Sequence, residues 1–254
     1  MKVAIMGHGP VGQATELMLF RAGVECDVQD PAMDKWITDW DTIDLAFICV
    51  PSDLDEETNK LSLEYVNKAI DDVPEFVHCV VRSTIGPDQI DDLSRPSSVM
   101  PEFIREHHWR DDVMSNLTPC VIGTIPIGAN TGEDEPIPEI QLLTKRFQET
   151  FMSPIVTDPA SAMMMKMSIN TFLAMKVAYA NNLWIMAKSL GISYDHLKKL
   201  ITLDNRMGQT HWDVPGPSGK FGFGGKCFPK DATHFANITG SESGLLQEVL
   251  KYKQ

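Results

Sequence analysis

Three glycines, Gly7, Gly9 and Gly12, form a G-x-G-x-x-G pattern near the start of this 254-residue chain. An apolar run over residues 2–6 precedes them, and a helix-forming stretch over residues 13–23 follows. In such a strand–turn–helix unit the first glycine allows a tight turn, the second lets a pyrophosphate approach the backbone, and the third lets helix pack on strand. The pattern predicts a dinucleotide site at the helix N-terminus, the alternative being a tight turn that binds nothing.

A second predicted strand, residues 24–30, ends in Asp30. A carboxylate at the end of the strand after the glycine turn can hold the ribose 2′-hydroxyl of a dinucleotide and would repel a 2′-phosphate. The expected cofactor is therefore NAD rather than NADP.

Three further apolar runs cover residues 44–50, 75–84 and 118–124, with helical stretches such as residues 61–70 between them. Strands that alternate with helices indicate an α/β fold, and continuous apolar runs are typical of parallel strands covered on both faces. We predict a Rossmann-type doubly wound parallel sheet in an NAD-binding domain of residues 1–157.

Near residue 158 the predicted secondary structure changes from alternating strands and helices to helices. Residues 158–191 read as one long helix, apolar nearly all the way round, which favours burial on several sides. Ser193 is a plausible cap for a second helix over residues 193–201. We predict an all-helical domain of residues 158–254 with a long central helix, in which a methionine stripe serves core and subunit packing.

Charge and cysteine usage exclude several classes of protein. The net charge is −13 with no dense basic patch, which argues against a nucleic-acid partner. The five cysteines are odd in number and include no C-x-x-C pair, so neither a disulfide framework nor a metal site is indicated. No signal peptide or membrane-spanning run is recognisable, and a reducing, cytoplasmic setting is expected.

The stretch GFGGKCFPKD, residues 222–231, places Cys227 between a glycine loop and an expected helix. Pro229 suits the first turn of a helix, so Cys227 would lie just ahead of the positive end of the helix dipole, which favours thiolate. Lys230 would act in the same direction, and the glycines leave room for a substrate beside the sulfur. The alternative is a small apolar filler at a loop–helix junction.

This stretch resembles the catalytic signature of the UDP-glucose/GDP-mannose dehydrogenase family. Five more segments resemble family motifs and occur in the family's order along the chain: GHGPVG (7–12), RSTIGP (82–87), PEFIRE (101–106), KMSIN (166–170) and LDNRMG (203–208). The resemblance implies oxidation of a sugar-nucleotide C6 alcohol, as in UDP-glucose, to a carboxylate with two NAD. It also implies a homodimer formed through the long helix.

The resemblance assigns roles to matching positions. Cys227 would add to the intermediate aldehyde, giving a thiohemiacetal and then a thioester that water hydrolyses. Lys166 and Asn170 would stabilise the oxyanion and position water, Asp231 would act in acid–base steps, and Glu106 would handle the hydrolytic water. The implied catalytic set is Cys227, Lys166, Asn170, Asp231, Glu106 and Thr84. The implied cofactor contacts are Gly7, Gly9, Pro10, Val11, Gly12, Asp30, Val50, Pro51, Ser83, Thr84, Glu102 and Lys230. The implied substrate contacts are Phe103, Arg105, Lys166, Asn170, Phe221, Gly222, Phe223 and Gly224.

The chain also departs from the family pattern. Family members carry a further C-terminal α/β domain that binds much of the nucleotide, and the present sequence stops in what resembles the helix leading to it. Lys220, in a loop with extra residues, is a candidate phosphate contact or an ordinary exposed lysine. Two alternatives therefore stay open: a two-electron hydroxy-acid dehydrogenase, and a non-catalytic NAD-binding protein.

Overall fold

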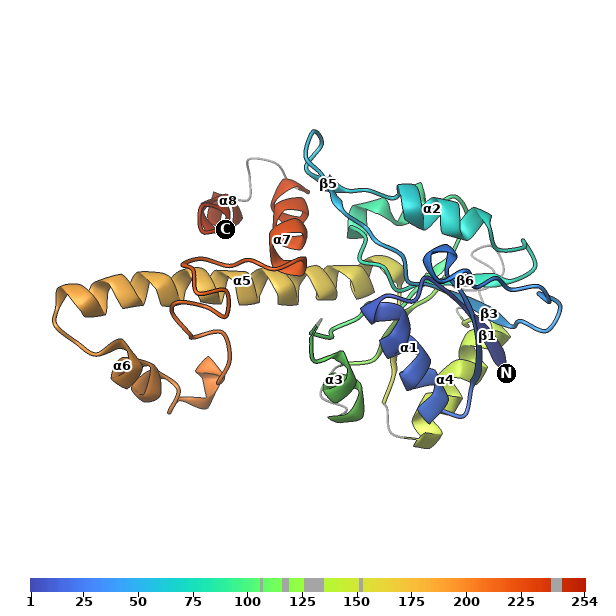
Figure 1. Cartoon of the computed structure of the whole chain (residues 1–254), viewed down its shortest axis with the longest axis horizontal. Helices are drawn as coiled ribbons and strands as arrows, with labels where there is room; N and C mark the ends of the chain where they lie inside the picture. Colours follow the sequence, from blue (N-terminus) through green and yellow to red (C-terminus); the bar gives the residue numbers. More distant parts are fainter. Residues whose placement is uncertain (106, 116–118, 126–134, 151–152, 239–243) are drawn as a thin grey trace. The chain divides into compact units, whose positions relative to one another are not determined.

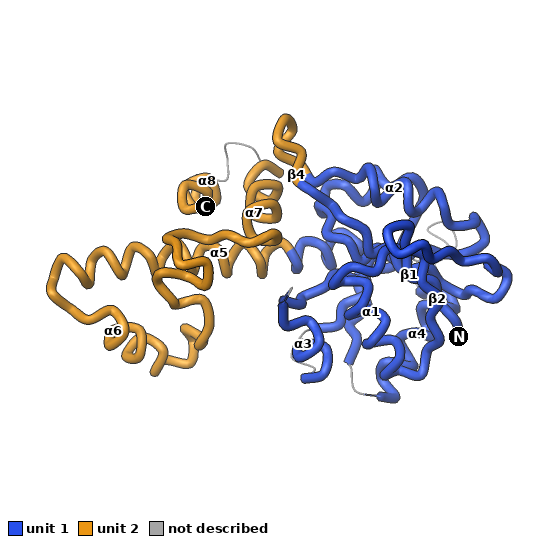
Figure 2. The backbone as a smooth tube through the Cα atoms, in the orientation of Figure 1, with its two compact units in different colours: residues 1–53, 61–166 blue, residues 54–60, 167–254 orange. Residues whose placement is uncertain are grey.

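The computed structural model describes residues 1–105, 107–115, 119–125, 135–150, 153–238 and 244–254. The chain divides into two compact units (Figure 2). Unit 1 comprises Met1–Asp53 and Leu61–Lys166, and unit 2 comprises Leu54–Lys60 and Met167–Gln254. Each unit has a hydrophobic core of its own.

Unit 1 contains a seven-stranded sheet in the order β2-β1-β3-β6-β7-β8-β9. The strands are β1 (Lys2–Met6), β2 (Glu25–Gln29), β3 (Leu45–Ile48), β6 (His78–Val81), β7 (Ser98–Val99), β8 (Val121–Gly123) and β9 (Ile155–Thr157). Neighbouring strands from β2 to β7 are parallel, β8 runs antiparallel to β7, and β9 runs parallel to β8. Because β2 and β3 lie on opposite sides of β1, the chain reverses its direction of winding there, which confirms the predicted doubly wound, Rossmann-type sheet.

Helices cover both faces of this sheet (Figure 1). They are α1 (Pro10–Arg21), α2 (Glu64–Asp71), α3 (Trp109–Ser115) and α4 (Pro138–Thr150), with 3-10 turns η1 (Pro31–Met33) and η2 (Pro87–Asp92). Along β1, Val3 and Ile5 join the core under α1 and α4, whereas Ala4 and Met6 join the core under α2. This alternation follows from the two-residue period of a strand.

Unit 2 is built on α5 (Pro159–Ser189), which begins in unit 1. Its other elements are α6 (Tyr194–Ile201), η3 (Asn205–Met207), α7 (Cys227–Asn237), α8 (Gly244–Leu250) and the tip of a hairpin formed by β4 (Leu54–Asp55) and β5 (Lys60–Leu61). The predicted cap is confirmed, because Ser193 Oγ accepts from the backbone N–H of His196. Within the described part of the chain, no helix is both long and apolar enough for a bilayer crossing.

Candidate active site

The glycine turn lies between β1 and α1, at the position where the winding of the sheet reverses. Gly7 has φ +90°, and a Cβ there would lie 2.9 Å from the carbonyl oxygen of Cys49, at the end of β3. A Cβ on Gly12 would lie 2.1 Å from Gly7 O, so glycine is required for α1 to approach the turn. At Gly9 a Cβ would meet nothing within 4 Å. Gly7 and Gly12 thus shape the turn, and Gly9 leaves open space beside its backbone.

The N-terminus of α1 has no side-chain cap. Gly9 is the N-cap and Pro10 follows it, so the backbone N–H groups of the first turn lack a partner from a capping side chain. Asp30, one residue beyond β2, accepts from the backbone N–H of His8 at 2.7 Å and of Ala32 at 2.9 Å. These bonds hold the Asp30 carboxylate beside the turn. The helix N-terminus at this turn can bind a phosphate group, and the carboxylate can bind a ribose hydroxyl.

The predicted residues after β3 and β6 also lie at this edge of the sheet. The Ser83 hydroxyl donates to Val50 O at 2.6 Å and joins the two strand ends, while Pro51 stays exposed and Thr84 is buried. The carboxyl ends of parallel strands therefore bring Gly7, Val50 and Ser83 to the same edge. This edge is where ligands bind in open α/β sheets.

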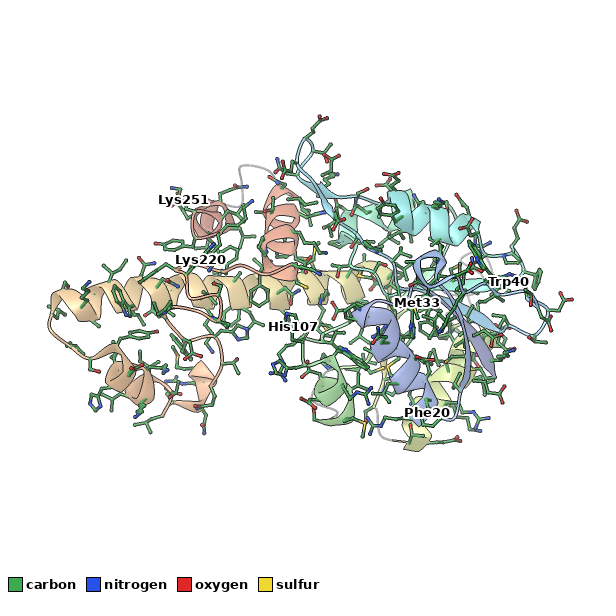
Figure 3. The ribbon with its side chains drawn as sticks, in the orientation of Figure 1. Phe20, Met33, Trp40, His107, Lys220 and Lys251 are labelled. Carbon is green, nitrogen blue, oxygen red and sulfur yellow. The ribbon has the colours of Figure 1, made fainter. Side chains whose placement is uncertain are left out.

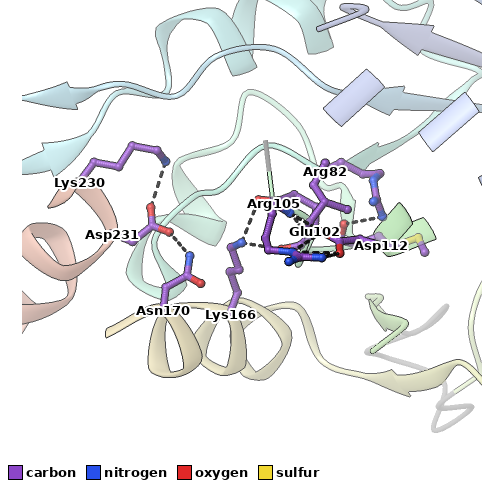
Figure 4. A network of polar contacts seen from close by, with 10 residues as sticks. Arg82, Glu102, Arg105, Asp112, Lys166, Asn170, Lys230 and Asp231 are labelled. Atoms are coloured by element: carbon purple, nitrogen blue, oxygen red, sulfur yellow. Dashed lines mark hydrogen bonds and ion pairs between the residues drawn. The ribbon is translucent and has the colours of Figure 1, made fainter. Parts of the chain in front are cut away.

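Lys166 and Glu102 form a buried ion pair in unit 1 (Figure 4). The Lys166 ammonium donates to Glu102 O at 2.5 Å and to Glu102 Oε1 at 2.8 Å, and it lies 5.3 Å from the centre of the Phe103 ring. Burial is the largest influence on Glu102 and opposes its ionisation. The Lys166 ammonium, the backbone N–H of Ile104 and nearby Arg82 together outweigh burial, so the pKa of Glu102 is lowered.

Arg105, a predicted substrate contact, forms an ion pair with a residue that the sequence did not indicate. Its guanidinium binds Asp112 on α3, with Nη2 2.5 Å from Oδ1, although the Arg105 side chain remains 66% exposed. Burial opposes ionisation of Asp112, but the Arg105 hydrogen bonds and charge prevail and lower its pKa. Neither Asp112 nor buried Arg82, whose guanidinium donates to Met100 O at 3.2 Å, was singled out from the sequence. Glu106, a predicted catalytic residue, lies outside the described residues.

A second cluster of predicted residues lies in unit 2. Cys227 is the first residue of α7, rather than the residue ahead of it, and Asp231 follows one turn later on the same face. Asp231 is fully buried; its Oδ2 accepts from Asn170 Nδ2 at 2.6 Å, and its Oδ1 lies 3.0 Å from Lys230 Nζ. Asn170 is on α5, four residues after Lys166, so these two side chains share a helix face.

Three of the other four cysteines, Cys49, Cys79 and Cys120, are buried, and Cys26 is partly buried. Burial raises the pKa of Cys26 and of Cys120 to about 12 and that of Cys49 to about 11, and it also raises the pKa of Cys79. Thiols with raised pKa are poor nucleophiles at neutral pH. The described residues contain no cluster of three or more His, Cys, Asp or Glu side chains that could hold a metal ion.

The glycine loop before Cys227 carries the other predicted substrate contacts. Phe221 is 48% exposed and packs edge-on against Trp184, with ring centres 4.9 Å apart. Phe223 is 2% exposed and belongs to the core of unit 2. Asn181, absent from the sequence prediction, accepts from the backbone N–H of Gly222 at 3.1 Å. Its sequence signal is a pair of adjacent asparagines, Asn181 and Asn182, in a largely apolar part of the long helix.

Known proteins resemble this chain in sequence and fold. Residues 160–252 match the UDP-glucose/GDP-mannose dehydrogenase family, central domain. The UDP-glucose 6-dehydrogenase of Rickettsia felis is 30% identical over 212 residues, which are 77% of this chain and 44% of that protein. The chain therefore spans less than half the length of this relative.

Two solved structures share the fold. A UDP-glucose dehydrogenase from Pyrobaculum islandicum superposes with a TM-score of 0.76 at 21% identity, over 99% of this chain and 68% of that one. The 3-hydroxyisobutyrate dehydrogenase of Mycobacterium tuberculosis superposes with a TM-score of 0.68 at 16% identity, over 98% and 91% of the two chains. The sequence matches decide between these two classes: the chain is related to the UDP-glucose/GDP-mannose dehydrogenase family, and residues 160–252 correspond to its central domain.

Proposed function

We propose that this chain supplies the NAD-binding and catalytic parts of an enzyme that oxidises a sugar-nucleotide C6 alcohol to a carboxylate. The observation that carries the proposal is the setting of Cys227. It starts α7, one turn before an Asp231 carboxylate that Asn170 and Lys230 hold in place.

The residues of unit 1 fit NAD. The uncapped first turn of α1 and the open space at Gly9 suit a pyrophosphate, and the Asp30 carboxylate suits a ribose hydroxyl. Within unit 1, the proposed cofactor contacts are completed by Val50, Pro51, Ser83, Thr84 and Glu102. Bound NAD would accept the hydride in each of two oxidation steps.

In the proposed reaction the Cys227 thiolate adds to the aldehyde carbon of the half-oxidised substrate. A carbon–sulfur bond forms and the carbonyl becomes the oxyanion of a thiohemiacetal, for which Lys166 and Asn170 supply N–H donors. Loss of the second hydride leaves a thioester. Water then attacks the thioester carbon, the carbon–sulfur bond breaks, and the thiol is restored while the acid departs. Asp231 accepts and returns protons, with its position held by Asn170.

We also propose a homodimer that forms through α5. Phe172, Tyr179 and Met186 lie at seven-residue spacing on this helix and are 62%, 52% and 57% exposed. A sustained seven-residue apolar stripe on a long helix is typical of a helix–helix interface. Phe172→Glu combined with Tyr179→Glu should yield a monomer in sedimentation velocity if this face pairs, and an unchanged mass would reject the assignment.

The activity is tested by incubating the protein with NAD and a panel of sugar nucleotides, and by measuring both reduced cofactor and acid. Two NADH for each acid are expected, and Cys227→Ser should abolish acid formation. Cys49→Ser, at a buried cysteine in the same chain, is the matched control. One NADH per turnover with a stable carbonyl product would instead favour the two-electron hydroxy-acid dehydrogenase. Calorimetric binding of NAD without binding of any sugar nucleotide would favour a non-catalytic role.

A further inference from the structure

Residues 252–254 pair with the glycine loop that precedes Cys227. Phe223 N donates to Tyr252 O at 3.0 Å, and Gln254 N donates to Phe223 O at 3.0 Å, so Phe223 and Lys253 form a parallel bridge. The side chain of Gln254 adds two bonds: its Nε2 donates to Gly222 O at 2.9 Å, and its Oε1 accepts from Ser218 Oγ at 3.0 Å. Figure 3 labels Lys220 on the loop and Lys251 just before this segment.

The loop glycines are explained by this contact. A Cβ on Gly222, where φ is +86°, would lie 2.1 Å from Tyr252 O, and a Cβ on Gly224 would lie 2.5 Å from Gln254 Oε1. The space that glycine leaves at these two positions is therefore occupied by residues 252–254. Gly225 differs, because its φ is +83° but a Cβ there would meet nothing within 4 Å. Among Gly222, Gly224 and Gly225, open space for a Cβ is therefore left at Gly225.

Both partners are tied to α5 by consecutive asparagines. Asn181, 2% exposed, accepts from Gly222 N at 3.1 Å. The amide of Asn182 lies within hydrogen-bonding distance of the Tyr252 hydroxyl, with Nδ2 at 2.7 Å and Oδ1 at 3.0 Å. The loop and the 252–254 segment thus share one rigid support.

We propose that the 252–254 segment positions the loop and, through it, Cys227, with Gln254 as the positioning residue. The loop runs directly from Gly224 into the first turn of α7, so a shift of its backbone moves the residues that flank the thiol. A role for this positioning in turnover rests on the proposed function. The positioning itself does not, and it can be measured without substrate.

The test uses the full chain and the variant Gln254→Ala, which removes two side-chain hydrogen bonds. Amide hydrogen exchange at Phe223 should accelerate about five- to tenfold, as expected for the net strength of such bonds. Alkylation of Cys227 by iodoacetamide should change by a similar factor, with Cys227→Ser identifying the labelled site. Where turnover is detected, KM for the sugar nucleotide should rise more than kcat falls.

Gly222→Ala and Gly225→Ala form a matched pair. Both impose alanine on a positive φ, but only the first drives a Cβ into Tyr252 O. The larger rise in Phe223 exchange, and the larger change in the alkylation rate of Cys227, are expected for Gly222→Ala. Unchanged Phe223 exchange in Gln254→Ala, or faster exchange with an unchanged alkylation rate, would overturn the proposal. Absence of sugar-nucleotide oxidation would overturn the proposed function alone, because neither readout needs turnover.

Discussion

The buried pair of Lys166 and Glu102 allows a prediction whose size and pH dependence both follow from the structure. Lys166→Met keeps a long unbranched side chain but removes the ammonium from a pair whose side chains are 3% and 7% exposed. Loss of one partner of a buried pair typically reduces the free energy of unfolding by about 3–5 kcal/mol, because the other charge stays buried and uncompensated. We expect a reduction of about that size at pH 7.

The reduction should shrink in acid. In the wild type the pKa of Glu102 is lowered, so its contribution to stability is present above the ordinary carboxyl pKa of about 4.3 and is lost as pH falls through the lower folded value. In Lys166→Met, both lowering influences of Lys166 are removed while burial remains, so we expect the pKa of Glu102 to rise. The free energy of unfolding of the variant is then reduced most at neutral pH, and it increases again in acid as Glu102 takes up a proton. The two proteins should therefore differ less at pH 4 than at pH 7.

Denaturant unfolding at the two pH values measures these differences. Lys145→Met is the matched control, since Lys145 is 70% exposed and lies 3.8 Å from Glu149, so a change within about 0.5 kcal/mol is expected. Adding Glu102→Gln to Lys166→Met should restore a large part of the lost stability. A reduction below about 1 kcal/mol for Lys166→Met at pH 7, or an equal reduction at pH 4, would refute the reasoning.

Three further predictions concern the glycine turn with its neighbour Asp30, and Cys227. Gly12→Ala should weaken NAD binding more than about tenfold in calorimetry, because its Cβ would displace α1 from the turn, while Gly23→Ala, with no neighbour within 4 Å, should leave binding near wild type. Asp30→Asn should weaken NAD binding and reduce the discrimination against NADP, and an unchanged NAD/NADP ratio would contradict the assigned ribose contact. At pH 7, peptide mapping after brief iodoacetamide treatment should find Cys227 labelled first, because it begins α7, where a helix N-terminus favours thiolate, while burial raises the pKa of the other four thiols; first labelling at Cys49 would contradict this.

Most of the sheet was predictable because most of its strands carried a sequence signal of their own. Continuous apolar runs matched β1, β3, β6 and β8, and the long apolar stretch matched α5 within two residues at each end. The strands β7 and β9 lacked such a signal. They have two and three residues, too few for a recognisable period, and their pairing with neighbours makes them strands.

The motifs named candidate site residues but did not reveal which residues would be their hydrogen-bonding partners. Lys166 and Glu102 are 64 residues apart in the chain, and Asn170 and Asp231 are 61 apart, so only the fold brings each pair within hydrogen-bonding distance. Asp112 is a clearer example of a partner that the sequence does not reveal. It lies in no motif, yet it is buried and binds the guanidinium of Arg105, which the family resemblance had assigned to substrate.

The glycines show why the sequence alone misassigned a physical cause. A glycine in a loop indicates that something approaches the backbone closely, but it does not identify what approaches. At Gly12 the neighbour is Gly7 O, five residues earlier, and the motif predicts it. At Gly222 the neighbour is Tyr252 O, thirty residues later, where no local pattern connects the two, and a substrate was the simpler expectation. The same residue type thus serves a local turn in one unit and a long-range contact in the other, and only the tertiary structure separates the two causes.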